Sequence, residues 1–203
     1  APLGTRVAAH AEVLELWQRW ELERGRVVLR RYGRTAEGRD YTETLVAALD
    51  GLRSQDIAVE CVQIDSWFYP HELIRPVGPE GAPIVPPTGA MRWEPREDLF
   101  PQGFADLRRR LGDRPLAFHA RHFSRQSPYW QRFAAWFDGA YAHPESAEFF
   151  DRILAQAADW GAATYEQDWM VESFHGVRGL REAPGRALAW QRALDDAADR
   201  HGL

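Results

Sequence analysis

Two aspartates close short β-prone segments of this chain. Within the stretch Trp160 to Met170, a β-prone segment ends at Asp168; a helix-forming run precedes this stretch and a polar loop from Ser173 to Gly185 follows it. Asp65 ends a similar segment upstream, Val62 to Ile64. In proteins that alternate strands and helices, the C-terminal ends of the strands carry the chemistry, because loops converge there on a rigid scaffold. The two carboxylates are therefore candidates to bind hydroxyl groups, and either could act as a nucleophile.

Further candidate side chains surround the two aspartates in sequence. Glu166 lies two residues before Asp168, so on a strand both point to the same side. It could bind a hydroxyl or tune the nucleophile, or it could be a buried acid paired with an arginine such as Arg121. Tryptophan faces beside carboxylates are one way to hold sugar rings, although most of the tryptophans are expected to be core residues. The candidates for this role are Trp67, Trp93 and Trp169.

His119 and His122 bracket Arg121 in a predicted strand. Residues three apart on a strand face opposite ways, so the two histidines could share a metal only across a bulge. A metal-dependent hydrolase built on His119, His122 and Asp168 is therefore a third-ranked hypothesis, and we predict no metal ligands. His119 or Arg121 alone is better interpreted as a ligand contact.

Composition narrows the function classes. The chain has 203 residues and a net charge of -5, without a basic face, so we predict no nucleic-acid partner. It contains no lysine, which excludes Schiff-base and P-loop lysine chemistry. No Gly-X-Gly-X-X-Gly follows a strand, and we predict no cofactor. No apolar run approaches ~20 residues. We therefore expect no membrane contact and a soluble protein, with the cytoplasm slightly favoured. The only cysteine, Cys61, is expected to be a small buried hydrophobe.

Helical and strand patterns alternate along the chain. We predict helices at Ala8 to Glu23, Tyr41 to Gln55 with Thr42 as its cap, from Pro101 through Leu111, at Pro128 to Phe137, through Phe149 to Ala157, and at Pro184 to His201. We predict strands at Arg26 to Tyr32, Ile57 to Ile64, Arg114 to Ser124 and the segment before Asp168. A long loop rich in Pro and Gly, about 68–101, is expected to be a functional lid.

A leading helix followed by four strand–helix units indicates an α/β fold with a parallel sheet. We predict one domain over 1–203. Four units fit either an open doubly wound sheet or half of an eight-stranded barrel.

The chain resembles the α-galactosidase and raffinose-synthase group of clan D glycoside hydrolases. The resemblance rests on Gln63-Ile64-Asp65 with Trp67, then Trp93-Glu-Pro, then Phe100-Pro101-Gln-Gly-Phe, then the strand end at Asp168. It implies a (β/α)8 barrel of the TIM type, here a partial barrel of about four units, and a retaining glycosidase. It also implies that Asp65 binds substrate hydroxyls and that Asp168 is the catalytic nucleophile.

The chain departs from that group at two motifs. Ser66 stands where the group has a second acid, and Glu166 or Gln167 stands where a lysine is usual. The group's acid/base residue lies two strands beyond the nucleophile. We therefore expect a carbohydrate-active protein that lacks the acid/base and is inactive alone, its barrel completed by further sequence or by a homodimer. The alternative is a non-catalytic sugar-binding or assembly module.

Overall fold

The computed structural model describes residues 38–59, 61–72, 89–139 and 141–203. The chain divides into two compact units, one formed by Ala1–Val62 with Pro95–Arg114 and the other by Gln63–Glu94 with Pro115–Leu203. We describe each unit by itself. The expected helix at Ala8 to Glu23 and the expected strand at Arg26 to Tyr32 lie outside the described residues. The prediction of one domain over 1–203 stays a prediction.

The first unit contains two helices, α4 (Tyr41–Arg53) and α5 (Gly103–Leu111). Asp40 caps α4 in a reciprocal capping box: its side chain accepts from the Glu43 N–H, and the Glu43 carboxylate accepts from the Asp40 N–H. The expectation that Thr42 caps this helix is therefore wrong. The sole cysteine, Cys61, is exposed, which contradicts the expected burial.

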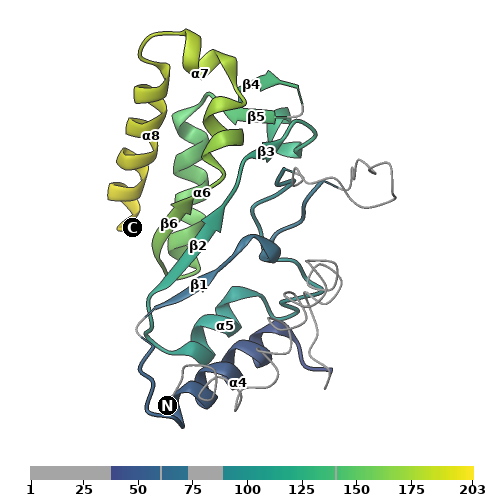
Figure 1. Ribbon diagram of the computed structural model, residues 1–203, viewed down its shortest axis with the longest axis vertical. Coiled ribbons are helices and arrows are strands. Elements are labelled where there is room, and N and C mark those ends of the chain that lie inside the picture. Colours follow the sequence, from purple (N-terminus) through teal and green to yellow (C-terminus); the bar gives the residue numbers. More distant parts are fainter. Residues whose placement is uncertain (1–37, 60, 73–88, 140) are drawn as a thin grey trace, which may run out of the picture. The chain divides into compact units, whose positions relative to one another are not determined.

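A parallel sheet of three strands forms the frame of the second unit (Figure 1). Its strands are β1 (Val62–Ile64), β2 (Leu116–Ala120) and β6 (Ala162–Gln167), in the order β1-β2-β6. The register pairs His119 with Glu166. Because side chains alternate along a strand, this register places a row of polar side chains on one face of the sheet.

The opposite face of this sheet is apolar and aromatic. Phe118 is fully buried, and its ring contacts the rings of Phe68, Trp93 and Trp160 in tilted or edge-on geometry. Helix α6 (Ala147–Asp159) packs against β6, and α8 (Arg186–His201) packs against α6. Five apolar residues of α6 are buried, and burying a large apolar side chain stabilises the fold by about 1.5–3 kcal/mol. They are Phe149, Phe150, Ile153, Leu154 and Ala157.

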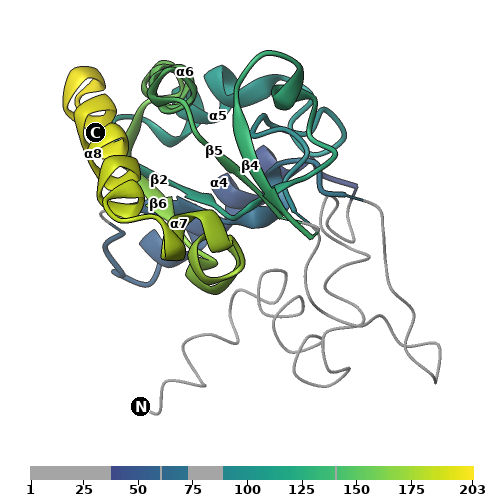
Figure 2. The same cartoon turned by 90° about the horizontal axis from the view of Figure 1, so that it is seen from above.

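A second, antiparallel sheet lies between β2 and α6 in the chain. Its strands are β3 (Phe123–Ser124), β4 (Ala135–Asp138) and β5 (Tyr141–Pro144), in the order β3-β5-β4. Figure 2 shows β4 and β5 side by side. A 3₁₀ helix, η2 (Pro128–Gln131), connects β3 to β4. The rest of the unit comprises the 3₁₀ helix η1 (Ser66–Phe68), the π-helix η3 (Val171–His175) and α7 (Arg178–Glu182).

The partial (β/α)8 barrel predicted from the sequence is wrong. A barrel needs a helix after each strand that returns the chain to the next parallel strand. After β2 the chain instead enters β3, and the antiparallel strands β5 and β4 follow before α6 begins. The described residues form a mixed α/β fold with two small sheets and no repeated strand–helix pattern.

Several segment predictions need smaller corrections. The aromatic stretch Pro128 to Phe137 contains η2 and β4 and is not one helix, because Trp136 and Phe137 join a strand pair with β5. The polar loop after Asp168 is largely helical, as η3 and α7. The strand expected over Ile57 to Ile64 is limited to β1. Part of the expected lid, 73–88, lies outside the described residues, and its flanks meet where His71 bridges Ala90.

Candidate functional site

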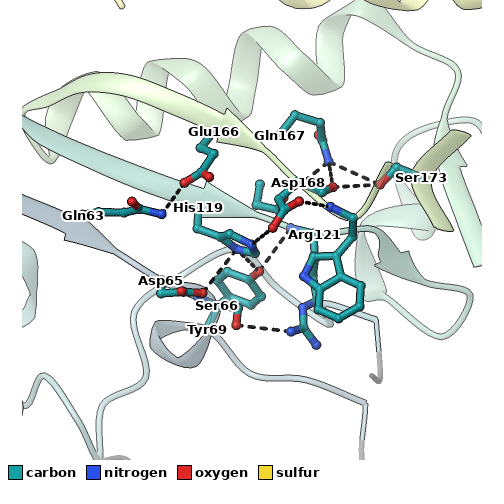
Figure 3. Close-up of polar contacts among 12 residues, drawn as sticks. Gln63, Asp65, Ser66, Tyr69, His119, Arg121, Glu166, Gln167, Asp168 and Ser173 are labelled. Atoms are coloured by element: carbon teal, nitrogen blue, oxygen red, sulfur yellow. Dashed lines mark hydrogen bonds and ion pairs between the residues drawn. The ribbon is translucent and has the colours of Figure 1, made fainter. Parts of the chain in front are cut away.

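Asp65 and Asp168 lie at the ends of the two outer strands of the parallel sheet, β1 and β6. The middle strand, β2, presents His119 between them (Figure 3). The Nε2 atom of His119 lies 3.2 Å from Asp168 Oδ2, and its Nδ1 atom lies 4.0 Å from Asp65 Oδ1. The histidine side chain is 3% exposed, whereas each aspartate side chain is 57% exposed. One buried imidazole therefore lies between two solvent-accessible carboxylates and forms a hydrogen bond with that of Asp168.

Tyr69 determines how His119 is protonated. Its hydroxyl oxygen accepts a hydrogen bond from the Arg121 N–H at 3.1 Å, which leaves the hydroxyl proton for His119 Nδ1 at 3.0 Å. Burial raises the pKa of Tyr69 above its usual value, so the phenol stays a donor. In neutral His119 the proton then lies on Nε2, which donates to Asp168.

Both aspartates are held by the backbone that follows them. The Asp65 carboxylate accepts from the Ser66 N–H, and Asp168 Oδ1 accepts from the Trp169 N–H at 2.7 Å. Trp169 has φ +56°, a left-handed conformation that is costly for a bulky residue and that concentrates at functional sites. The strand end at Asp168 is therefore a sharp turn that fixes the carboxylate.

Arg121 places a cation against the residues that follow the two aspartates, Ser66 and Trp169. Its guanidinium lies 4.9 Å from the centre of the Trp169 ring, and its Nη2 donates to Ser66 Oγ at 3.2 Å. Its Nη1 also donates to His71 Nδ1 at 3.4 Å. The side chain is buried and therefore fixed, and it holds the half-exposed indole of Trp169 at the rim of the site.

Three contacts fix the loop that carries Asp168. The Asp168 N–H donates to the Ala120 carbonyl at 2.8 Å. The Asp168 carbonyl in turn accepts from Gln167 Nε2 at 3.1 Å and from Ser173 Oγ at 3.3 Å. The peptide units on both sides of the carboxylate are thereby restrained, which favours a preorganised group over a mobile one.

Glu166 contacts Gln63 across the polar face of the sheet. Its carboxylate accepts a hydrogen bond from Gln63 Nε2 (Figure 3). The ion pair between Glu166 and Arg121, one of the two expectations for this acid, is not the contact seen. Glu166 thus joins the same face as the two aspartates and is held by a neutral amide.

The tryptophans predicted to contact a ligand differ in position. Trp169 lies at the rim of the site. Trp67 lies in η1, directly after the β1 end, and is half-buried. Trp93 is fully buried, and its Nε1 donates to the His119 carbonyl at 2.9 Å. Its ring cannot stack on a ligand in this structure, and it supports β2 from behind.

The two histidines of the hypothetical metal site, His119 and His122, lie in different environments. Both ring nitrogens of His119 face partners in the carboxylate site, whereas His122 is buried beside His143 in a separate cavity. Within the described part of the chain, no group of three or more His, Cys, Asp or Glu side chains is placed to hold a metal ion.

Sequence reasoning missed His71, which accepts from Arg121, and two further residues of the site. Tyr69 lies in the segment interpreted as a loop, and its partner His119 is 50 residues away. Ser173 lies in η3, which was expected to be irregular. Neither position carries a local pattern that signals its role, because each is defined by a contact with another strand or loop.

The arrangement offers oriented hydrogen-bond acceptors to a ligand, beside an indole held by the buried Arg121. Each aspartate is more than half exposed, so hydrogen-bond acceptor positions remain available on both carboxylates. Such a set suits a ligand with several hydroxyl groups, and a carboxylate held this way can also attack carbon.

The sequence matches no protein-family model and no curated protein. None of the described helices is long and apolar enough to cross a membrane.

Proposed function

We propose that this chain binds a carbohydrate at the site formed by Asp65, His119 and Asp168, and that Asp168 is the nucleophile of a retaining glycoside hydrolase reaction. The observation that carries the proposal is that the Asp168 carboxylate is both oriented and exposed. Its two oxygens are oriented by the Trp169 N–H and by His119, and the side chain is still 57% exposed. The resemblance of the strand ends to the α-galactosidase group supports the same assignment.

Binding requires only groups that are already in place. The Asp65 and Asp168 carboxylates accept hydrogen bonds from sugar hydroxyls, and hydrogen bonds to charged acceptors are stronger than neutral ones. The Trp169 indole, held over the Arg121 guanidinium, supplies an apolar face at the rim. Sugar rings combine both kinds of surface, since their hydroxyl edges are polar and their C–H faces are apolar.

The chemical step adds one requirement. Asp168 attacks the anomeric carbon as the bond to the leaving group breaks; a leaving oxygen would need a proton from an acid ~5 Å from the nucleophile, whereas a fluoride leaves as the anion. Water then hydrolyses the glycosyl ester and returns the carboxylate. A substrate whose leaving group needs no proton isolates the role of Asp168 from that of the acid.

A fluorinated glycosyl fluoride tests the proposal. Fluoride leaves without a proton, and fluorine at the sugar 2-position slows hydrolysis of the ester, so the glycosyl group accumulates on the nucleophile. The protein is incubated with each member of a panel of 2-deoxy-2-fluoroglycosyl fluorides. We expect at least one of them to increase the mass of the protein by one glycosyl group, which peptide mapping locates at Asp168. Asp168→Asn should abolish labelling. Asp159→Asn, at an exposed aspartate that ends α6, is the matched control and should label normally.

Binding is measured separately by NMR titration with monosaccharides. Asp65→Asn should weaken affinity roughly ten- to a hundredfold, because it removes a charged acceptor. Sugars that cause no shift changes at the site, together with no labelling by the panel, would refute both parts of the proposal.

A second function, a non-catalytic sugar-binding module, is favoured by the contact of Glu166. This acid lies on the same face as Asp168, but the Gln63 amide occupies its carboxylate. Sugar binding that depends on Asp65 and Asp168, without any labelling of Asp168, would identify this alternative.

A further inference from the structure

Three residues that line one small cavity behind the candidate site each carry a buried nitrogen atom without a hydrogen-bond partner among the described residues. These atoms are His122 Nδ1, His143 Nε2 and Trp190 Nε1. The three residues are 4%, 3% and 5% exposed. All three line a cavity of about 10 Å³, which is close to the least volume that holds a water molecule.

The elements that form the cavity are far apart in sequence. His143 belongs to β5 and Trp190 to α8, while His122 follows β2 directly. The rings of His143 and Trp190 are perpendicular, with their centres 4.7 Å apart. Polar residues from distant parts of the chain therefore line one space, and an unsatisfied buried polar atom is costly.

The protonation of His143 follows from its other contact. The Ser173 backbone raises the pKa of this ring, as a carbonyl acceptor does, and Nε2 is without a partner among the described residues, so we assign the proton of the neutral ring to Nδ1. In the neutral ring Nε2 is then an acceptor, whereas Trp190 Nε1 can only donate. A direct indole-to-imidazole bond would satisfy both atoms, but no such bond is formed.

We infer that one ordered water molecule occupies this cavity, accepts from Trp190 Nε1 and donates to His143 Nε2, with His122 Nδ1 as its third partner. A buried water typically makes about three hydrogen bonds to groups that are otherwise unsatisfied. The donor and acceptors here match the two donor and two acceptor positions of water. A cation fits less well because the cationic residue Arg121 also lines the cavity, and an anion fits less well because two of the three nitrogens are acceptors.

Burial keeps the two imidazoles in the form that this water needs. Desolvation lowers the pKa of His143 to about 4, and desolvation together with the charge of Arg121 lowers the pKa of His122 to about 4. Both rings are therefore neutral near pH 7 and retain an acceptor nitrogen.

The water also borders the loop of the candidate nucleophile. Gln167 and Ser173, which hold the Asp168 carbonyl, line the same cavity. The water thus connects β5 and α8 to the rear of the turn that presents Asp168. Its role is structural and does not depend on the proposed function.

A high-resolution crystal structure of the full chain tests the inference directly. We expect density for one water within about 2.7–3.2 Å of at least two of the three nitrogens. Proton-correlated ¹⁵N spectra should show His143 protonated at Nδ1. An empty cavity, or a direct hydrogen bond between Trp190 Nε1 and His143 Nε2, would overturn it.

Magnetic relaxation dispersion of water in solution provides an independent measurement with matched variants. Trp190→Phe removes the donor and keeps a ring, so we expect one long-lived water fewer and a lower unfolding midpoint. Trp136→Phe is the control, because Trp136 stacks on the same His143 ring at 5.9 Å but does not line the cavity. It should keep the long-lived water. An equal count of long-lived waters in the wild type and Trp190→Phe would contradict the inference.

Discussion

The hydroxyl of Tyr69 sets the orientation of the hydrogen bonds through the candidate site. It receives the Arg121 N–H and donates to His119, which in turn donates to Asp168. A single buried hydroxyl therefore determines which ring nitrogen of neutral His119 carries the proton, and so whether Nε2 can donate to the candidate nucleophile.

Tyr69→Phe should destabilise the fold by about 1–3 kcal/mol, because it leaves the Arg121 N–H without this acceptor in a buried site. It should also release the tautomer of His119, since the donor to Nδ1 is lost. Chemical denaturation measures the first effect, and the ¹⁵N shifts of His119 measure the second.

Tyr129→Phe is the matched control for this prediction. Its hydroxyl also accepts a backbone N–H, from Trp93 at 3.1 Å, and burial raises its pKa to about 12. The control should lose a similar stability and leave the His119 tautomer unchanged. A wild-type His119 protonated at Nδ1, or a tautomer unaffected by Tyr69→Phe, would contradict this direction of the hydrogen bonds from Arg121 to Asp168.

Single residues of the site were partly predictable. Asp65 and Asp168 follow β-prone runs, and this local pattern located them and indicated that they share one sheet edge. His119 was identified as a ligand contact, whereas the structure places it beneath both carboxylates. That role depends on the strand order β1-β2-β6, which no local pattern contains.

At the scale of elements, the π-helix η3 controls the position of the loop behind Asp168. Ser173 of η3 donates to the Asp168 carbonyl, and the helix is followed by Gly176. A Cβ on Gly176 would lie 2.7 Å from the Glu172 carbonyl oxygen and 2.7 Å from the Tyr141 ring. Only a glycine fits there without moving η3.

Gly176→Ala should therefore destabilise the protein by about 1–3 kcal/mol, as overpacking in a filled site does. Gly179→Ala in α7 is the control, since its Cβ would meet only the flexible end of Arg186 at 3.4 Å and two Trp136 ring atoms near 3.8 Å. It should be neutral or stabilising by up to about 1 kcal/mol, because alanine favours helix over glycine. Thermal unfolding measures the stability of both variants. An unchanged stability of Gly176→Ala would show that η3 can shift to accommodate the added Cβ at no cost.

Elements with a strong helical period were predictable, and those defined by pairing were not. The helices α4, α6 and α8 overlap the predicted segments, with ends shifted by a few residues. The aromatic run at Pro128 to Phe137 was assigned to a helix. Its last residues pair with β5, because Trp136 is opposite His143 and Phe137 is opposite Ala142. Aromatic residues suit both structures, so the partner strand decides.

For the whole molecule, the error in the predicted fold came from the segment between β2 and α6. Strand and helix patterns on either side of it alternate as a barrel would require. The antiparallel sheet in between is built from strands of two to four residues, too short to produce a clear alternation. The sequence thus predicted the parallel frame around the site and missed the sheet inserted into it.

The two buried histidines make the stability of the second unit depend on pH. His122 and His143 have pKa values lowered to about 4, from 6.5 for an exposed ring, chiefly by desolvation. Between these values the unfolded chain binds more protons than the folded one. The stability they provide is therefore complete above about pH 6.5 and is lost as the pH falls toward 4.

Within this window, the free energy of unfolding should fall by up to about 2.7 kcal/mol per pH unit, since each site contributes up to about 1.36. Denaturation followed by tryptophan fluorescence, from about pH 4.5 to 7.5, measures the slope. His143→Gln replaces one titrating ring by a neutral amide and should reduce the slope by about half. His175→Gln, at an exposed histidine in η3, should leave it unchanged. A flat profile in the wild type, or an undiminished slope in His143→Gln, would show that these rings are already charged in the folded protein, in conflict with the pKa values that burial lowers.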